Sequence, residues 1–245
     1  MPQEFSPTVT VADDAAAAAR AAAEIIAGVV RDDPRACLGL ATGGTMIPVY
    51  AELAAMVARG EVSLAQVSSF NLDEYVGLPP DHPQSYRHFM NLHLAGPAGM
   101  DPARMEVPSG IAADAGAEAA RYEAALAARG PVALQLLGLG GNGHIGFNEP
   151  GSDSDSRTRV VTLDARTVAD NARFFGPGEE VPRRAISMGV GTILSARRIL
   201  LVATGAGKAG AVRAMLQGPV GPDCPASFLR LHPAAQVVLD RAAAG

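Results

Sequence analysis

Apolar runs and helical stretches alternate along most of the chain. Five apolar runs predict buried strands, over residues 36–41, 67–72, 132–139, 159–163 and 197–204. Patterns with helical spacing predict helices over residues 13–30, 48–59, 82–94, 112–128, 165–175 and 205–217. Because strands that alternate with helices form parallel sheets covered on both faces, we expect an α/β fold. The expected architecture is a three-layer αβα arrangement with a mainly parallel open sheet of Rossmann-like type.

Glycine-rich or acidic turns follow four of the predicted strands. The turns are, in chain order, ATGGT, LDEY, GGNGH and TGAGK. In open α/β sheets, ligands collect at the carboxyl ends of the strands. We therefore expect the four turns to contribute to one pocket.

The segment GLGGNGHIGFNE, residues 138–149, is the most informative of these turns. Its glycines let the backbone approach a ligand closely, and His144 and Glu149 are spaced so that an imidazole and a carboxylate can converge on a proton. Gly138, Gly140 and Gly143 also fit the dinucleotide-binding fingerprint, which requires a helix to begin at the third glycine. The continuation HIGFNEPGSDSDS has no apolar helical stripe, which argues against a nucleotide cofactor.

Other candidate residues admit two interpretations each. Gly43, Gly44 and Thr45 either bind a phosphate at a helix N-terminus or form a tight strand-to-helix turn. Asp73 and Glu74 end an apolar strand and are either solvated caps or general bases. The segment GAGKAGA around residue 208 resembles a phosphate-binding loop but lacks its first glycine and its Ser or Thr, which argues against a nucleotide triphosphatase and leaves Lys208 as a candidate ligand for a single phosphate.

No metal site is expected from the histidines, because His88 and His93 lack the i, i+4 spacing of a helical metal pair. Cys37 and Cys224 belong to no C-x-x-C motif, so we expect reduced, packed thiols. His144 itself is either a structural hydrogen-bonding group or a catalyst, and its glycine-rich setting favours catalysis.

Composition places the chain among ordinary globular proteins. With 245 residues, 48% of them hydrophobic and 18% charged, and with no biased linker, it suits a single domain over residues 1–245. A net charge of −5 with scattered basic residues argues against a nucleic-acid partner, although a few local cations can still hold an anionic small molecule. Neither a signal peptide nor a membrane span is indicated, so we expect a cytoplasmic protein.

Five segments of the chain resemble the glucosamine-6-phosphate deaminase family, in order and at matching intervals. They are LATGGTMIPVYAEL, SSFNLDEYVGLPPDHPQSYRHFM, LGLGGNGHIGFNEPGS, TLDARTVADNARFF and LHPAAQVVLD. The resemblance implies conversion of glucosamine 6-phosphate and water into fructose 6-phosphate and ammonia. It implies no metal and no organic cofactor.

The resemblance also assigns roles to site residues. It implies that Asp73 moves a proton from C2 to C1, that His144 opens the pyranose ring, and that Glu149 orients and polarises His144. Asn142 stands where many family members have an aspartate, so it can orient His144 but adds no charge.

The same family pattern implies a phosphate site. The phosphate would rest on the backbone at Gly43, Gly44 and Thr45, with Arg173 and Lys208 supplying charge-assisted hydrogen bonds. Arg173 lies in a segment, near residues 160–180, that is expected to act as a lid over the substrate.

The regulation and the assembly of this protein are expected to differ from those of the allosterically regulated relatives. Val161 stands where those relatives have a lysine, and the chain stops soon after VVLD, so we do not expect activation by N-acetylglucosamine 6-phosphate. A monomer is favoured, and a homo-oligomer remains an alternative.

Two other functions remain open on the sequence alone. One is a 6-phosphogluconolactonase, an enzyme of related fold whose glycine-histidine turn continues differently. The other is a non-catalytic sugar-phosphate sensor, although no basic patch or DNA-binding extension is present.

Overall fold

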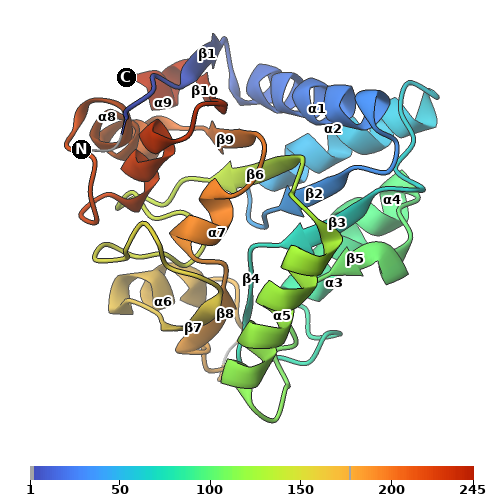
Figure 1. Cartoon of the computed structure of the whole chain (residues 1–245), viewed down its shortest axis with the longest axis vertical. Coiled ribbons are helices and arrows are strands. Elements are labelled where there is room, and N and C mark those ends of the chain that lie inside the picture. The colour runs from blue at the N-terminus through green and yellow to red at the C-terminus, as the bar shows by residue number, and fades with distance from the viewer. Residues whose placement is uncertain (1–2, 177) are drawn as a thin grey trace.

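The computed structural model describes residues 3–176 and 178–245. Strands from this part of the chain form a seven-stranded parallel sheet at the centre of the protein (Figure 1). Its order is β1-β10-β9-β6-β2-β3-β5, and each neighbouring pair is parallel. The strands are β1 (Thr8–Ala12), β2 (Cys37–Leu40), β3 (Ser68–Asn71), β5 (Met105–Glu106), β6 (Leu134–Gly138), β9 (Ile199–Ala203) and β10 (Ala235–Asp240). The predicted α/β fold is confirmed.

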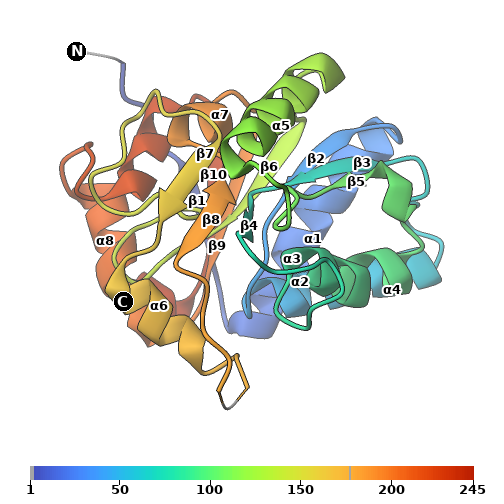
Figure 2. The ribbon, with the colours of Figure 1, turned by 90° about the horizontal axis from the view of Figure 1, so that it is seen from below.

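Helices cover both faces of this sheet (Figures 1 and 2). α1 and α2 pack against each other on one face, and α5 and α7 lie on the opposite face. The α-helices are α1 (Ala15–Asp32), α2 (Met46–Ala58), α3 (Tyr86–Met90), α4 (Gly96–Ala98), α5 (Ala115–Arg129), α6 (Ala165–Ala172), α7 (Val190–Leu194), α8 (Ala209–Gln217) and α9 (Arg241–Ala244). Tighter or wider helical turns are η1 (Asn91–Ala95), η2 (Pro102–Arg104), η3 (Ala206–Lys208) and η4 (Pro225–Leu231).

The small side chains of α1 explain its close fit to the sheet. Its buried face consists of alanines with Ile26, Val29 and Val30, and Asp14 accepts a hydrogen bond from the Ala17 backbone at 2.7 Å to begin the helix. The helix contacts β9 and β10, whose side chains are almost all buried. This packing fixes the position of the helix against β9 and β10.

The prediction of one helix over residues 82–94 is wrong in detail. The helix begins only at Tyr86, because Ser85 in extended conformation caps it, and its second half continues as the wider η1 turn. The other predicted helices and strands are present with shifted ends.

A second, three-stranded antiparallel sheet was not expected. It has the order β4-β8-β7, formed by β4 (Asp73–Tyr75), β8 (Arg184–Ser187) and β7 (Arg159–Thr162). The strand predicted at residues 159–163 therefore exists but does not belong to the parallel sheet. The LDEY turn likewise does more than end a strand, because its residues start a new strand that pairs with β8. Both errors arise because a short strand does not reveal its partner by its own pattern.

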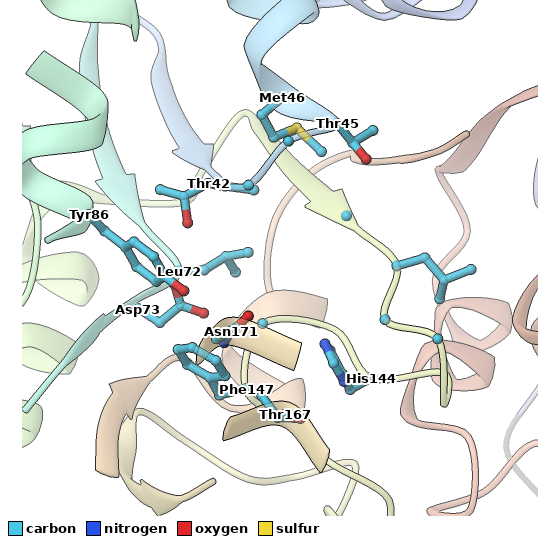
Figure 3. Close-up of a pocket in the computed structure, with 18 of the residues that line it drawn as sticks. Thr42, Thr45, Met46, Leu72, Asp73, Tyr86, His144, Phe147, Thr167 and Asn171 are labelled. Carbon is cyan, nitrogen blue, oxygen red and sulfur yellow. The ribbon is translucent and has the colours of Figure 1, made fainter. Parts of the chain in front are cut away.

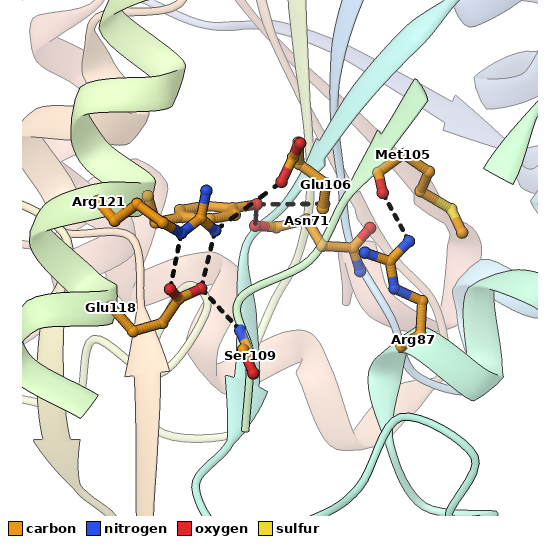
Figure 4. Close-up of polar contacts among 8 residues, drawn as sticks. Asn71, Arg87, Met105, Glu106, Ser109, Glu118 and Arg121 are labelled. Carbon is orange, nitrogen blue, oxygen red and sulfur yellow. Dashed lines mark hydrogen bonds and ion pairs between the residues drawn. The ribbon is translucent and has the colours of Figure 1, made fainter. Parts of the chain in front are cut away.

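Polar contacts hold α5 against the end of β3 and α3 against the neighbouring strand β5 (Figure 4). The Tyr122 hydroxyl on α5 donates to the Asn71 carbonyl at 2.7 Å, and Arg87 Nη1 on α3 donates to the Met105 carbonyl at 2.6 Å. Asn71 immediately precedes Leu72 and the second sheet, so these contacts fix the point from which β4 departs.

Within the described residues, no helix has the combination of length and apolar character needed to cross a bilayer.

Candidate active site

The four predicted turns meet around one cavity at the carboxyl ends of the parallel strands (Figure 3). The cavity has a volume of about 290 Å³. Its lining includes, from these turns, Thr42, Gly43, Gly44, Thr45, Leu72, Asp73, Gly138, Leu139, Gly140, Gly141, His144 and Lys208. The expectation of a shared pocket is confirmed.

Strand β4 separates the two acidic residues of the LDEY turn. Because side chains alternate along a strand, Asp73 faces the cavity while Glu74 points the other way. The Glu74 carboxylate accepts hydrogen bonds from Ser85 Oγ at 2.8 Å and from the Tyr86 backbone at 3.0 Å. Glu74 is therefore a buried helix cap of α3, and Asp73 is the carboxylate available to a ligand.

Asp73 is buried at the wall of the cavity, with 6% of its surface exposed. No hydrogen bond from the described residues reaches its carboxylate. Burial, together with the negative charge of Glu74, raises the pKa of Asp73 well above its ordinary value. An ionised carboxylate in this setting is a stronger base than an exposed aspartate, which suits abstraction of a proton from carbon.

The glycine-rich turn after β6 fixes the position of His144. The Gly140 backbone donates to the His144 carbonyl at 2.9 Å, and a Cβ on Gly140 would lie 2.4 Å from atoms of the imidazole ring. Only glycine leaves room for the ring over the turn. Further along the loop, a Cβ on Gly146 would lie 3.4 Å from Asp73 Oδ2, so the same loop closely approaches the other candidate proton carrier.

A carboxylate and an amide support His144 from outside the cavity lining. Glu149 Oε2 lies 3.4 Å from His144 Nδ1, and this nitrogen is buried without an aligned hydrogen bond. Asn142 donates to Glu149 Oε2 at 2.8 Å and accepts from the His144 backbone at 3.3 Å. The structure thus brings Asn142 and Glu149 to His144, but neither side chain lines the cavity.

The environment of Glu149 keeps it ionised. Burial raises the pKa of its carboxyl, but contacts with His144, Thr167 and Asn142 more than offset this effect and lower it to about 2. The Thr167 hydroxyl donates to Glu149 Oε1 in this arrangement. Glu149 therefore supplies the negative charge that Asn142 lacks.

The opposite end of the cavity suits an anion. Gly43, Gly44 and Thr45 precede α2, and no side chain caps the first backbone N–H groups of this helix. Arg173 and Lys208 line the same end and also an adjoining cavity of about 470 Å³. All five residues predicted to bind phosphate therefore lie together.

The described residues contain no group of three or more His, Cys, Asp or Glu side chains that could hold a metal ion. His82 lies near Phe175, with ring centroids 6.2 Å apart, and its Nε2 lies 3.7 Å from Glu179 Oε1.

Residues 140–158 contain no helix, so the GxGxxG match lacks the helix that a dinucleotide needs.

The cavity lining also includes side chains that the sequence interpretation missed, among them Tyr86, Phe147, Thr167 and Asn171. Two of these, Thr167 and Asn171, carried a usable signal, because polar residues four apart lie on one face of a helix. The two aromatic residues carried none, since aromatic residues are typical of an ordinary core.

Comparison with known proteins gives consistent matches across the chain. Residues 10–239 match the family model described as glucosamine-6-phosphate isomerases/6-phosphogluconolactonase. A glucosamine-6-phosphate deaminase of Rhodopirellula baltica is 53% identical, covering 96% of this chain and 93% of that protein. One from Streptomyces coelicolor is 52% identical, covering 96% of this chain and 91% of that protein.

Solved structures agree with this assignment. A structure described as a monomeric glucosamine-6-phosphate deaminase matches with a TM-score of 0.94 and 43% identity, over 97% of this chain and 98% of that one. A 6-phosphogluconolactonase from Trypanosoma cruzi has a TM-score of 0.76 at 20% identity, over 99% of this chain and 97% of that one, and shares the fold alone. The chain therefore belongs to the glucosamine-6-phosphate isomerase/6-phosphogluconolactonase family, and it is more similar to the glucosamine-6-phosphate deaminases of this family than to the lactonase structures.

Proposed function

We propose that this protein is a glucosamine-6-phosphate deaminase, which converts glucosamine 6-phosphate and water into fructose 6-phosphate and ammonia. One observation carries the proposal: a buried carboxylate, Asp73, and an imidazole, His144, line the same cavity, whose far end has two cationic side chains and a helix N-terminus. The identity of 53% to a deaminase over most of the chain supports it.

Binding begins at the phosphate end. The backbone at Gly43, Gly44 and Thr45 donates to the phosphate, and Arg173 and Lys208 add charge-assisted hydrogen bonds. These contacts are made equally in the ground state and the transition state, so they fix the position of the sugar without accelerating the chemistry directly.

Ring opening requires a proton to move between O1 and O5. His144 carries this proton, taking it from the O1 hydroxyl and giving it to O5 as the C1–O5 bond breaks. Glu149 stabilises the imidazolium that forms, because its ionised carboxylate lies 3.4 Å from Nδ1. Asn142 orients both groups and remains neutral throughout.

Isomerisation requires a second proton path. Asp73 removes the proton from C2 of the open-chain aldehyde, and O1 takes a proton from the protonated 2-amino group, which gives an enolamine. Asp73 then returns its proton to C1. The double bond then lies between C2 and nitrogen. Water adds to C2, and ammonia leaves as the C2–N bond breaks. Two carriers are needed because O5 and C2 lie on different parts of the sugar.

The surrounding features belong to the same proposal. Residues 1–245 act as one domain in which α6 and the residues after it, near 160–180, close over the substrate. The protein acts as a monomer, supported by its likeness to a structure described as monomeric. It works in the cytoplasm, because a charged sugar phosphate stays in the compartment where it is made.

The test is product formation from purified protein. Incubation with glucosamine 6-phosphate is expected to release ammonia and fructose 6-phosphate in equal amounts, and 6-phosphogluconolactone is expected to hydrolyse no faster than without protein. Hydrolysis of the lactone with no ammonia from the amino sugar would replace the deaminase with a lactonase. Binding without either reaction would indicate a sensor.

A further inference from the structure

Helix α6 contacts the site through two polar side chains that the mechanism above does not use. Thr167 and Asn171 are four residues apart, which places them on one face of the helix, and both line the cavity (Figure 3). Each is also hydrogen bonded to a different part of the site. The helix therefore reaches two groups that belong to separate proton paths.

Thr167 contacts the ring-opening group. Its side chain is buried, with 7% of its surface exposed, and its hydroxyl donates to Glu149 Oε1. The other oxygen of that carboxylate faces His144 and Asn142. Because a carboxylate held at both oxygens cannot rotate, the Thr167 bond decides which way Oε2 points toward the imidazole.

Asn171 contacts the strand that carries the base. Its Nδ2 donates to the Tyr75 hydroxyl at 2.8 Å. Tyr75 is two residues after Asp73 on the same face of β4, and its ring packs against Tyr86 and Phe147, with centroids 5.1 and 5.5 Å away. Tyr86 and Phe147 line the cavity beside Asp73 (Figure 3).

We propose that Thr167 and Asn171 are positioning residues through which helix α6 sets the geometry of both proton carriers. Thr167 orients Glu149 and, through it, His144. Asn171 fixes Tyr75 on β4 and the rings of Tyr86 and Phe147 that pack against it, and through them the position of Asp73. The inference rests on the proposed deaminase function. Arg173, which lines the phosphate end of the cavity, directly follows the last residue of the same helix.

The first test removes only the Thr167 hydroxyl. Thr167→Val keeps the branched shape and is expected to lower kcat on glucosamine 6-phosphate about tenfold, the value of one hydrogen bond to a charged group, with KM changed less than about twofold. Thr167→Ser keeps the hydroxyl and is expected to retain most of the wild-type kcat. Thr162→Val is the matched control, because Thr162 is an exposed residue of β7 outside the cavity.

A second substrate separates positioning from a structural role. An analogue methylated at both O4 and O5 can close neither to a pyranose nor to a furanose, so it stays in the open-chain form and bypasses the step assigned to His144. Thr167→Val is expected to process this analogue at the wild-type rate, whereas a structural defect would slow both substrates. Equal losses on the two substrates, or a raised KM with unchanged kcat, would overturn the role of Thr167. If Thr167→Val does not fold, as judged by circular dichroism, Thr167→Ala with the same pair of substrates takes its place.

The second residue is tested by a double-mutant cycle. Asn171→Leu is expected to slow both substrates, because both undergo the proton transfer at C2 that is assigned to Asp73. Tyr75→Phe is expected to cause a similar loss, and the double variant no further loss, since both remove the same bond. Additive losses would contradict the role of Asn171. If Thr167→Val is as active as the wild type and Thr162→Val, the inference is refuted and the proposed function stands. If the wild type releases no ammonia, the proposed function itself is refuted.

Discussion

Replacing Glu149 by Gln is expected to destabilise the protein in a pH-dependent manner. The pKa of this carboxyl falls from 4.5 to about 2 in the folded protein. At about 1.4 kcal/mol per pH unit, the folded state favours the ionised form by about 3 kcal/mol. Since the side chain is only 15% exposed, solvent screening removes little of this free energy.

The sign follows from the direction of the change. A lowered folded-state pKa means that the unfolded chain binds more protons in the interval between the two values, so stability rises with pH there. The contribution of Glu149 is complete above pH 4.5 and is lost as the pH falls toward 2. Glu149→Gln should therefore cost about 3 kcal/mol in the free energy of unfolding at pH 7 and less than about half of that at pH 3.

Urea unfolding of both proteins at the two pH values measures this difference. Glu52→Gln on α2 is the control, because this residue lies outside the cavity and is expected to have a small effect at both pH values. An equal cost of Glu149→Gln at pH 7 and pH 3 would show that the contribution is not that of an ionised carboxylate. The absence of any cost at pH 7 would refute the reasoning entirely.

Three further predictions concern the proton carriers and their loop. Asp73→Asn should reduce turnover by about 10²-fold or more without weakening substrate binding in calorimetry. Because the folded-state pKa of Asp73 is raised, its ionised carboxylate destabilises the folded protein, so the same variant should raise Tm at neutral pH but not at acid pH. Exchange of the C2 proton with solvent deuterium at the wild-type rate in this variant would contradict the role as base, and an unchanged Tm would contradict the raised pKa. His144→Gln should slow cyclic substrate far more than an open-chain analogue. Gly143→Ala should lower the free energy of unfolding, measured in urea, by about 2 kcal/mol or more. The reason is that Gly143 has φ +86° and that a Cβ there would lie 2.6 Å from Cys224 Sγ. Adding Cys224→Ala should recover part of this loss.

The sequence by itself determined the α/β fold, the four adjacent strands β9, β6, β2 and β3, and the end of the sheet that carries the site, whereas β1, β5 and β10 were not predicted. β2, β6 and β9 are almost entirely apolar and buried, with Gln135 as their one polar side chain, and a glycine or threonine follows each strand within two residues. Such a pattern is local, because a strand buried on both sides must be apolar throughout and its end must turn. Gly43, Gly44, Thr45, His144 and Lys208 could be selected because their turns follow these strands, and Asp73 because it follows β3. Arg173 follows α6 instead, and only the resemblance to the family indicated it.

Only the tertiary structure decided which neighbouring side chains cooperate. β4 and β8 are short strands, and nothing in DEY or RAIS indicates that they pair with each other. That pairing separates the roles of Asp73, which faces the cavity, and Glu74, which caps α3. The links from α6 to Glu149 and Tyr75 join residues 18 and 96 positions apart in the chain. Contacts at such separations depend on packing between elements, which the periodicity of a single segment does not encode.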